Sequence, residues 1–176
     1  MNLVLGVTGS ISAYKAVEIL RIFQKNEHNV SVIMTKEAKK FISPLTFETF
    51  IPGRVYSELF KENQDPVLHI NISRTNDLLL IAPATANIIG KIANGIADDL
   101  LSTTFLAFYG KIVIAPAMNS FMYENIAVKE NIDKLKSRNV EVIEPEKGEL
   151  ACKDTAKGRL ASYNRIYNYC VGIKSV

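Results

Sequence analysis

The sequence predicts an α/β fold in which helices cover both faces of a parallel sheet, giving three layers. Short apolar runs without polar alternation recur along the chain, as expected for strands that are buried on both faces. The clearest runs are residues 79–81 and 112–114, and each is followed by Ala-Pro-Ala. Segments with apolar residues at helical spacing separate the runs. This strand-helix alternation predicts a doubly wound parallel sheet of the Rossmann or flavodoxin-like kind.

Each predicted strand is a β-rich apolar run bounded by polar or turn-forming residues. The runs read LVLGV, VSVIM, DLLLI, KIVI and VEVI in chain order. Proline lacks an N–H and restricts the residue before it, so Pro83 and Pro116 are expected to end their strands. The predicted strands are residues 3–7, 30–34, 77–81, 111–114 and 140–143.

The predicted helices occupy the segments between these strands. Residues 11–25 have apolar side chains at helical spacing, and a short helix suits residues 36–42. Residues 87 to about 108 and 125–137 are expected to form longer helices. An irregular stretch is expected around Pro44 and Pro52.

The segment 144–162 differs from the rest of the chain. It is polar, contains two glycines and shows neither helical nor strand periodicity. It is therefore expected to be a long loop, and loops of this length in a compact domain are usually functional or disordered. Cys152 in its middle favours the functional interpretation.

Length and composition restrict the class of protein. A chain of 176 residues fits one domain, which we expect to span residues 1–176. The net charge is +3 and the basic residues are scattered, which argues against nucleic acid as the main partner. No apolar run reaches membrane-spanning length, and Met1 leads directly into a strand, so neither a membrane anchor nor a signal peptide is expected. Cys152 and Cys170 lack metal-ligand spacing, and a reduced, cytoplasmic protein without a metal is predicted.

Two asparagines follow the two Ala-Pro-Ala segments. Asn87 comes shortly after the third predicted strand, and Asn119 comes shortly after the fourth. Ligands of open α/β sheets bind beyond the carboxyl ends of the strands, where both amides are expected. Two buried strands with ordinary turns would give the same pattern, so the motif alone leaves both interpretations open.

The turn after the first strand is typical of an anion site. It reads GVTGSISAYK from Gly6 to Lys15, and helix N-termini of this kind bind phosphate. The spacing is not that of a dinucleotide fingerprint, and no acidic residue of the kind that holds an NAD ribose is found where the second strand ends, at Met34-Thr35-Lys36. A mononucleotide such as FMN is therefore favoured, although Ser10 or Ser12 could also be a simple helix cap.

Two further residues are candidates for proton transfer. His69 precedes the third strand, and a histidine titrates near neutral pH, although a single histidine is more often structural. Cys152 has Lys153 beside it and other basic residues nearby, and positive charge lowers a thiol pKa. It could equally be a bystander thiol in a loop.

Taken together, these motifs resemble those of the flavin-dependent cysteine decarboxylase family, and within it the members that act on 4'-phosphopantothenoylcysteine. The family motif Pro-Ala-Ser-Ala-Asn-Thr corresponds to residues 83–88, and Pro-x-Met-Asn-x-x-Met-aromatic corresponds to residues 116–123. The family's His-Ile pair is matched at His69, and its Ala-Cys-Gly-Asp loop is matched at residues 151–154. The resemblance extends from Gly6 to about residue 161.

The resemblance implies an FMN-dependent decarboxylation that yields 4'-phosphopantetheine in coenzyme A biosynthesis. In this family FMN oxidises the thiol to a thioaldehyde, CO2 leaves to give an ene-thiol, and reduced FMN returns the hydride. By correspondence, His69 would be the acid–base group, and Cys152, in a substrate-clamp loop at about 145–162, would protonate the ene-thiol. Asn119 and Met122 would bind the substrate. The residues expected to contact FMN are Gly9, Ser10, Ile11, Ser12, Thr35, Thr85, Ala86, Asn87 and Ala117.

The resemblance also implies a homotrimer or a multiple of trimers, with FMN at a subunit interface, and a ligase for the same pathway, either fused or separate. Lys153 stands where the family has glycine, and Ile88 replaces a hydroxyl residue. A peptidyl-cysteine decarboxylase of lantibiotic biosynthesis would share both asparagine motifs but lack the loop cysteine. A flavin-binding regulatory subunit without activity would not require His69, Asn119 and Cys152 together.

Overall fold

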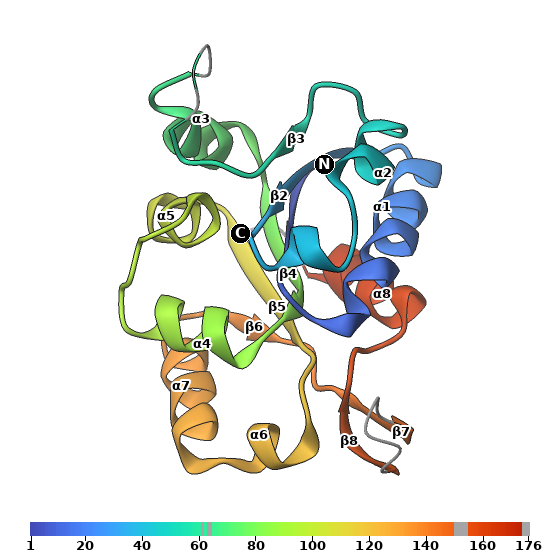
Figure 1. Cartoon of the computed structure of the whole chain (residues 1–176), viewed down its shortest axis with the longest axis vertical. Coiled ribbons are helices and arrows are strands. Elements are labelled where there is room, and N and C mark those ends of the chain that lie inside the picture. Colours follow the sequence, from blue (N-terminus) through green and yellow to red (C-terminus); the bar gives the residue numbers. More distant parts are fainter. Residues whose placement is uncertain (61, 63–64, 150–154, 174–176) are drawn as a thin grey trace.

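A six-stranded sheet forms the centre of the computed structural model, which describes residues 1–60, 62, 65–149 and 155–173 (Figure 1). The strand order is β3-β2-β1-β4-β5-β6, and every neighbouring pair is parallel. The predicted fold class is therefore confirmed. The strands are β1 Asn2–Val7, β2 Asn29–Met34, β3 Val55–Tyr56, β4 Leu78–Ala84, β5 Lys111–Pro116 and β6 Glu141–Val142.

Helices cover both faces of this sheet, as Figure 1 shows. On one face, α1 (Ala16–Lys25) and α8 (Tyr163–Gly172) share a core with the side chains of Leu3, Leu5 and Val7. On the other face, the core contains residues of the remaining long helices. These are α3 Leu68–Thr75, α4 Ala86–Ala93, α5 Leu100–Ala107 and α7 Ile126–Lys136. No helix among these described segments is long and apolar enough to cross a membrane.

The two strands that contain the Ala-Pro segments end at different positions relative to their prolines. Pro116 is the last residue of β5, as predicted, whereas β4 continues through Pro83 to Ala84. The β4–β5 pairing shifts register between Ile81 and Ala84, and Ala84 then pairs with Pro116. The prediction that Pro83 ends its strand was wrong because the ladder passes around the proline and resumes after it.

The predicted helix over residues 87–108 is divided into α4 and α5. Asn94 caps the end of α4, and Gly95 follows with a φ of +72°, a left-handed conformation that glycine adopts without strain. Asp99 then begins α5 through a capping box with Ser102. The Asn-Gly pair was the available signal for this break.

Other short segments also differ from the prediction. The predicted helix 11–25 begins as a 3-10 turn, η1 (Ile11–Lys15), before α1, and 36–42 contains only the 3-10 turn η2 (Ala38–Lys40). The stretch expected to be irregular contains α2 (Pro44–Glu48), which Ser43 caps through a bond from the Leu45 N–H (3.2 Å). His69 lies within α3 (Leu68–Thr75), a helix that was not predicted from the sequence and that precedes β4.

The segment 144–162 contains an antiparallel ribbon instead of an unstructured loop. β7 (Glu146–Glu149) pairs with β8 (Thr155–Arg159), so the prediction that it lacks strands was wrong. β8 also joins the main body, because the Met118 N–H donates to the Gly158 carbonyl (3.0 Å). This bond lies just before α6 (Ser120–Glu124), the helix that follows β5. Cys152 lies outside the described residues.

We predict that Gly110→Ala destabilises the sheet. A Cβ at Gly110 would lie 2.4 Å from the carbonyl oxygen of Asp77, which already accepts a bond from the Lys111 N–H (3.0 Å). Backbone must move to relieve this overlap, and we expect a loss of about 1–3 kcal/mol in the free energy of unfolding, measured by urea denaturation. Gly172→Ala is the matched control, since a Cβ there meets nothing within 4 Å. Equal unfolding midpoints for the two variants would contradict this explanation.

Candidate functional site

A cavity of about 840 Å³ lies at the carboxyl ends of β1, β4 and β5. β2 and β3 are added on one side of β1, whereas β4, β5 and β6 are added on the other side. The order in which strands join the sheet therefore reverses at this point. Crevices at such a switch point are the usual ligand sites of open α/β sheets. The cavity volume falls in the range of about 300–1,000 Å³ that is typical of small-molecule sites.

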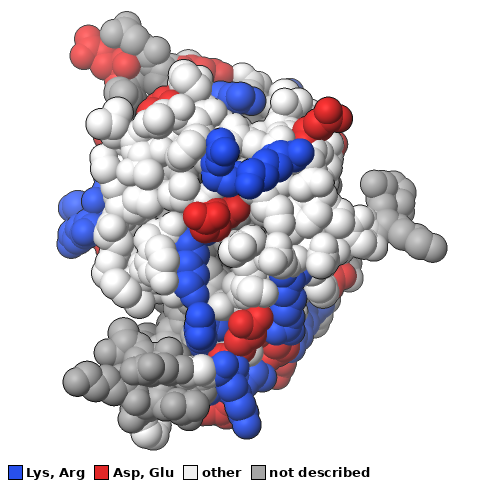
Figure 2. All heavy atoms as spheres, turned by 90° about the vertical axis from the view of Figure 1, so that its right-hand side faces the viewer, with Lys and Arg blue, Asp and Glu red and all other residues white. Residues whose placement is uncertain are grey.

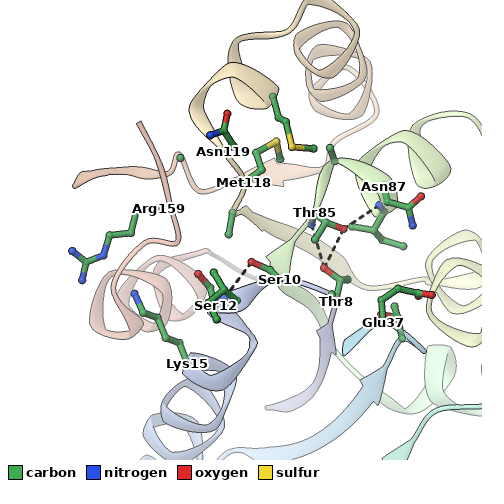
Figure 3. A pocket seen from close by; sticks show the side chains of 18 of the residues that line it. Thr8, Ser10, Ser12, Lys15, Glu37, Thr85, Asn87, Met118, Asn119 and Arg159 are labelled. Atoms are coloured by element: carbon green, nitrogen blue, oxygen red, sulfur yellow. Dashed lines mark hydrogen bonds between the residues drawn. The ribbon is translucent and has the colours of Figure 1, made fainter. Parts of the chain in front are cut away.

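Hydrogen bonds from Thr8 hold the β1 and β4 turns together (Figure 3). The buried Thr8 hydroxyl donates to the carbonyl of Pro83 (2.6 Å) and accepts from the N–H of Thr85 (3.2 Å). Thr85 in turn caps α4 by accepting a bond from the N–H of Ile88 (3.4 Å). One hydroxyl therefore fixes the relative position of two turns that line the cavity.

The turn after β1 combines a helix cap with a close backbone approach. Ser10 Oγ accepts a bond from the Ser12 N–H (3.2 Å), so Ser10 is a helix cap and also lines the cavity. A Cβ at Gly9 would lie 2.4 Å from the Cβ of Glu37, and glycine therefore lets this turn approach the one after β2. Thr35, in that second turn, accepts a bond from the Ala38 N–H (3.2 Å) and also lines the cavity.

Asn87 and Asn119 line the same cavity, although they are more than thirty positions apart in the chain (Figure 3). Asn87 is exposed in the first turn of α4. Asn119 caps α6, because its Oδ1 accepts a bond from the Phe121 N–H (2.9 Å). Ile88, in contrast, is 1% exposed and packs in the core, so its aliphatic side chain supports α4 at the cavity wall.

All the residues that the sequence assigned to FMN, and both residues assigned to substrate, line this cavity. They are Gly9, Ser10, Ile11, Ser12, Thr35, Thr85, Ala86, Asn87, Ala117, Asn119 and Met122.

His69 is not among the residues that line the cavity. It lies on α3, at the top of Figure 1, whereas α6 and β8 lie at the bottom. Its Nδ1 atom is buried and has no hydrogen-bond partner among the described residues. A buried polar atom without a partner is unusual and often marks a functional position.

Several other residues of the cavity were not predicted from the sequence. Lys15 and Arg159 are the basic ones, and Met118 and Gly158 provide the backbone bond that joins β5 to β8. Lys15 belongs to the same turn as Ser10, which was the available signal, whereas nothing local in the sequence brings Arg159 to this turn.

A cluster around Glu144 fixes α6 against the ribbon. The Glu144 carboxylate accepts bonds from the Tyr123 hydroxyl (2.5 Å), Lys157 Nζ (2.8 Å) and Lys136 Nζ (3.2 Å). Burial by itself would raise the pKa of Glu144, but the bonds from Lys157, Tyr123 and Lys136 outweigh it and lower that pKa from 4.5 to about 2. Burial and the bond to Glu144 raise the pKa of Tyr123, which therefore keeps its proton and donates it.

We predict that this cluster makes stability depend on acid pH. The folded pKa of Glu144 lies below its ordinary value, so its contribution is full above about pH 5 and is lost as the pH falls toward 2. The parent should have a higher free energy of unfolding than Glu144→Gln above about pH 5. This difference should become smaller as the pH falls toward about 2. Because the side chain is 38% exposed, solvent screening limits the effect to about 1 kcal/mol. Urea denaturation between pH 2 and 7 measures it, with the exposed Glu27→Gln as control. A difference between parent and Glu144→Gln that is constant over this pH range would contradict the assignment.

Comparison with known proteins identifies the family. A model of the family described as Flavoprotein matches residues 1–174. The coenzyme A biosynthesis bifunctional protein CoaBC of Bacillus subtilis is 48% identical over 160 residues, which are 90% of this chain and 39% of that protein. The chain thus spans about two fifths of the length of that bifunctional relative.

A relative of similar length gives the same result. The probable phosphopantothenoylcysteine decarboxylase of Streptococcus mutans is 40% identical over 94% of each chain. A solved structure of a cysteine-to-serine mutant of PPC decarboxylase, complexed with pantothenoylaminoethenethiol, has a TM-score of 0.85 and 30% identity, covering 97% of this chain and 96% of that one. The match over residues 1–174, together with these relatives, shows that the chain belongs to the Flavoprotein family.

Proposed function

We propose that the protein catalyses the FMN-dependent decarboxylation of 4'-phosphopantothenoylcysteine to 4'-phosphopantetheine, a step of coenzyme A biosynthesis. The observation that carries this proposal is the convergence of the β1 turn, Asn87 and Asn119 on one cavity. The similarity to a probable phosphopantothenoylcysteine decarboxylase over 94% of the chain supports it. A phosphopantothenoylcysteine ligase, fused or separate, would supply the substrate, consistent with the bifunctional relatives.

The chemistry of the cavity wall fits FMN. Hydroxyl groups and backbone amides of the turns after β1 and β2 suit a ribityl phosphate, and Ala86 and Ala117 leave room for a flat apolar ring. When bound, FMN would supply the two-electron redox chemistry that lets CO2 leave from an unactivated cysteine derivative. The residues that would hold it are Gly9, Ser10, Ile11, Ser12, Thr35, Thr85, Ala86, Asn87 and Ala117.

Asn119 and Met122 would orient the substrate. The Oδ1 atom of Asn119 accepts from a backbone N–H, so the amide is held in one orientation with Nδ2 as its donating atom. A donor of this kind can position a carboxylate. Met122 is 49% exposed and lines the cavity, where its flexible chain can pack against the substrate's aliphatic part. The protonation of the ene-thiol by Cys152 remains a prediction.

We also propose a homotrimer, or a multiple of trimers, in which His69 reaches the flavin of a neighbouring copy. His69 does not line the cavity of its own chain. Large apolar side chains are exposed near the helix α5 that packs against α3, namely Ile96, Leu106 and Tyr109. The two helices are joined by a bond from the Ser73 hydroxyl to the Ala107 carbonyl. An apolar surface beside α3 would bring the histidine to an interface.

The function is tested with the purified protein. We expect a flavin absorption spectrum and, after anaerobic addition of 4'-phosphopantothenoylcysteine, release of CO2 with 4'-phosphopantetheine as product. Flavin without turnover on this compound would contradict the proposed substrate, and turnover on peptides that end in cysteine would then indicate a peptidyl-cysteine decarboxylase. Absence of flavin after reconstitution with FMN would contradict the cofactor.

We predict that His69→Asn and Asn119→Asp complement each other. Each variant alone should lose CO2 release while it still binds FMN. If His69 acts across an interface, mixed oligomers contain some sites with both native residues, and activity should return when the two variants are co-expressed and purified through two different tags. If both residues came from the same chain, mixed oligomers would stay inactive. Oligomers of either single variant, made with the same two tags, are the control.

A further inference from the structure

The short helix α6 contains Met122 and is capped by Asn119, the two residues that would bind the substrate. It has five residues, and a helix of this length depends on packing against the rest of the molecule. Phe121 is 80% exposed and Met122 is 49% exposed, whereas Tyr123 is 6% exposed. Tyr123 therefore anchors α6 to the body of the protein.

Glu144 joins three elements around this anchor. Its carboxylate accepts a bond from the Tyr123 hydroxyl of α6. It also accepts bonds from Lys157 on β8 and from Lys136 at the end of α7. Nζ of Lys157 lies 5.2 Å from the centroid of the Tyr123 ring, a cation–π distance, so these two side chains also interact with each other.

The elements that Glu144 connects reach the cavity, although Glu144 itself is not among the residues that line it. Lys157 precedes Gly158, which lines the cavity and accepts a bond from the Met118 N–H (3.0 Å). Figure 1 shows α6 beside β8, and Figure 3 shows that Met118 and Asn119 lie next to each other at the cavity. The spacing of α6 and β8 is thus set by Glu144 together with one backbone bond.

Glu144 differs from an ordinary surface ion pair. On the face seen in Figure 2, basic and acidic side chains are interspersed, and exposed pairs of this kind contribute little to stability. Burial by itself would raise the pKa of Glu144, but the bonds from Lys157, Tyr123 and Lys136 lower that pKa to about 2, so the group is a carboxylate at neutral pH. Its effect on position can exceed its effect on stability, because a displacement of about 1 Å at a reacting group can reduce turnover about a hundredfold.

We propose that Glu144 is a positioning residue for the decarboxylation, which holds α6 and β8 at the spacing that lets Asn119 and Met122 orient the substrate. This inference rests on the proposed function. Glu144 acts through Tyr123 and Lys157 and touches no reacting atom. Its loss is therefore expected to lower the rate of the reaction at neutral pH, where we expect the protein to remain folded.

Turnover of two FMN-loaded variants, Glu144→Ala and Tyr123→Phe, tests this role. Glu144→Ala removes the bonds from all three donors, and kcat for CO2 release from 4'-phosphopantothenoylcysteine should fall by about ten- to a hundredfold. Tyr123→Phe removes only its own bond and keeps the ring, so a fall of about two- to tenfold is expected. Flavin content, read from the absorption spectrum, should stay at the parental level in both. Parental kcat in Glu144→Ala would overturn the proposal.

A second tyrosine–glutamate bond, outside the cavity, provides the matched control. The Tyr169 hydroxyl donates to Glu141 (2.8 Å) and joins α8 to β6, and neither residue lines the cavity. Tyr169→Phe and Glu141→Ala should therefore keep the parental kcat. Losses in these controls as large as those in the Glu144 and Tyr123 variants would indicate a general effect of stability and would overturn the positioning role.

A double variant tests whether Tyr123 acts through Glu144. Without the carboxylate the hydroxyl has lost its acceptor, so Tyr123→Phe should lower kcat no further in the Glu144→Ala background. A further fall as large as that of Tyr123→Phe alone would mean that the two residues act independently, which contradicts the proposal.

The position of α6 can also be measured without the reaction. The chain has four methionines, so NMR of isotope-labelled methionine methyl groups can follow Met122. Its signal should shift in Glu144→Ala, which leaves the sequence of α6 unchanged, and should stay in place in Glu141→Ala. An unshifted Met122 signal in Glu144→Ala would overturn the proposal. If the signal shifted but the parent released no CO2, the proposed decarboxylation would fail, while the role of Glu144 in placing α6 would stand.

Discussion

The parallel pairing of β1 with β4 is the constraint on which the site depends. It places the turn that follows Val7 beside the turn that follows Ala84, and the hydroxyl of Thr8 joins the two through bonds to Pro83 and Thr85. Backbone groups at strand ends need partners, and here a buried side chain supplies them. The two turns, fixed to each other in this way, form part of the cavity wall.

The second constraint connects the ribbon β7–β8 to the end of β5. The Met118–Gly158 backbone bond and the Glu144 carboxylate, which holds both Tyr123 and Lys157, act on the same small region. Gly158 is required at this contact, because a Cβ there would lie 2.3 Å from the carbonyl oxygen of Met118. The ribbon therefore brings Arg159, at the end of β8, to the cavity in a defined position.

Much of the fold and of the candidate site was predictable from local signals. Uninterrupted apolar runs identified β1, β2, β4 and β5, since parallel strands buried on both faces need no polar alternation. The rule that ligands bind at the carboxyl ends of such strands then placed Asn87 and Asn119 in one cavity. Short elements such as β3 and the ribbon were missed, because their conformation comes from pairing with distant segments and not from their own composition.

The sequence by itself thus determined the layered α/β architecture, the end of the sheet that holds the cavity, and the side chains contributed by each strand end. Only the tertiary structure decided that Lys15 and Arg159 line the same cavity and that His69 is not among the residues that line it. The physical reason is the range of the forces involved. Burial patterns and turn preferences act within a few residues, whereas an electrostatic pair or a shared cavity depends on distances that only the packed chain sets.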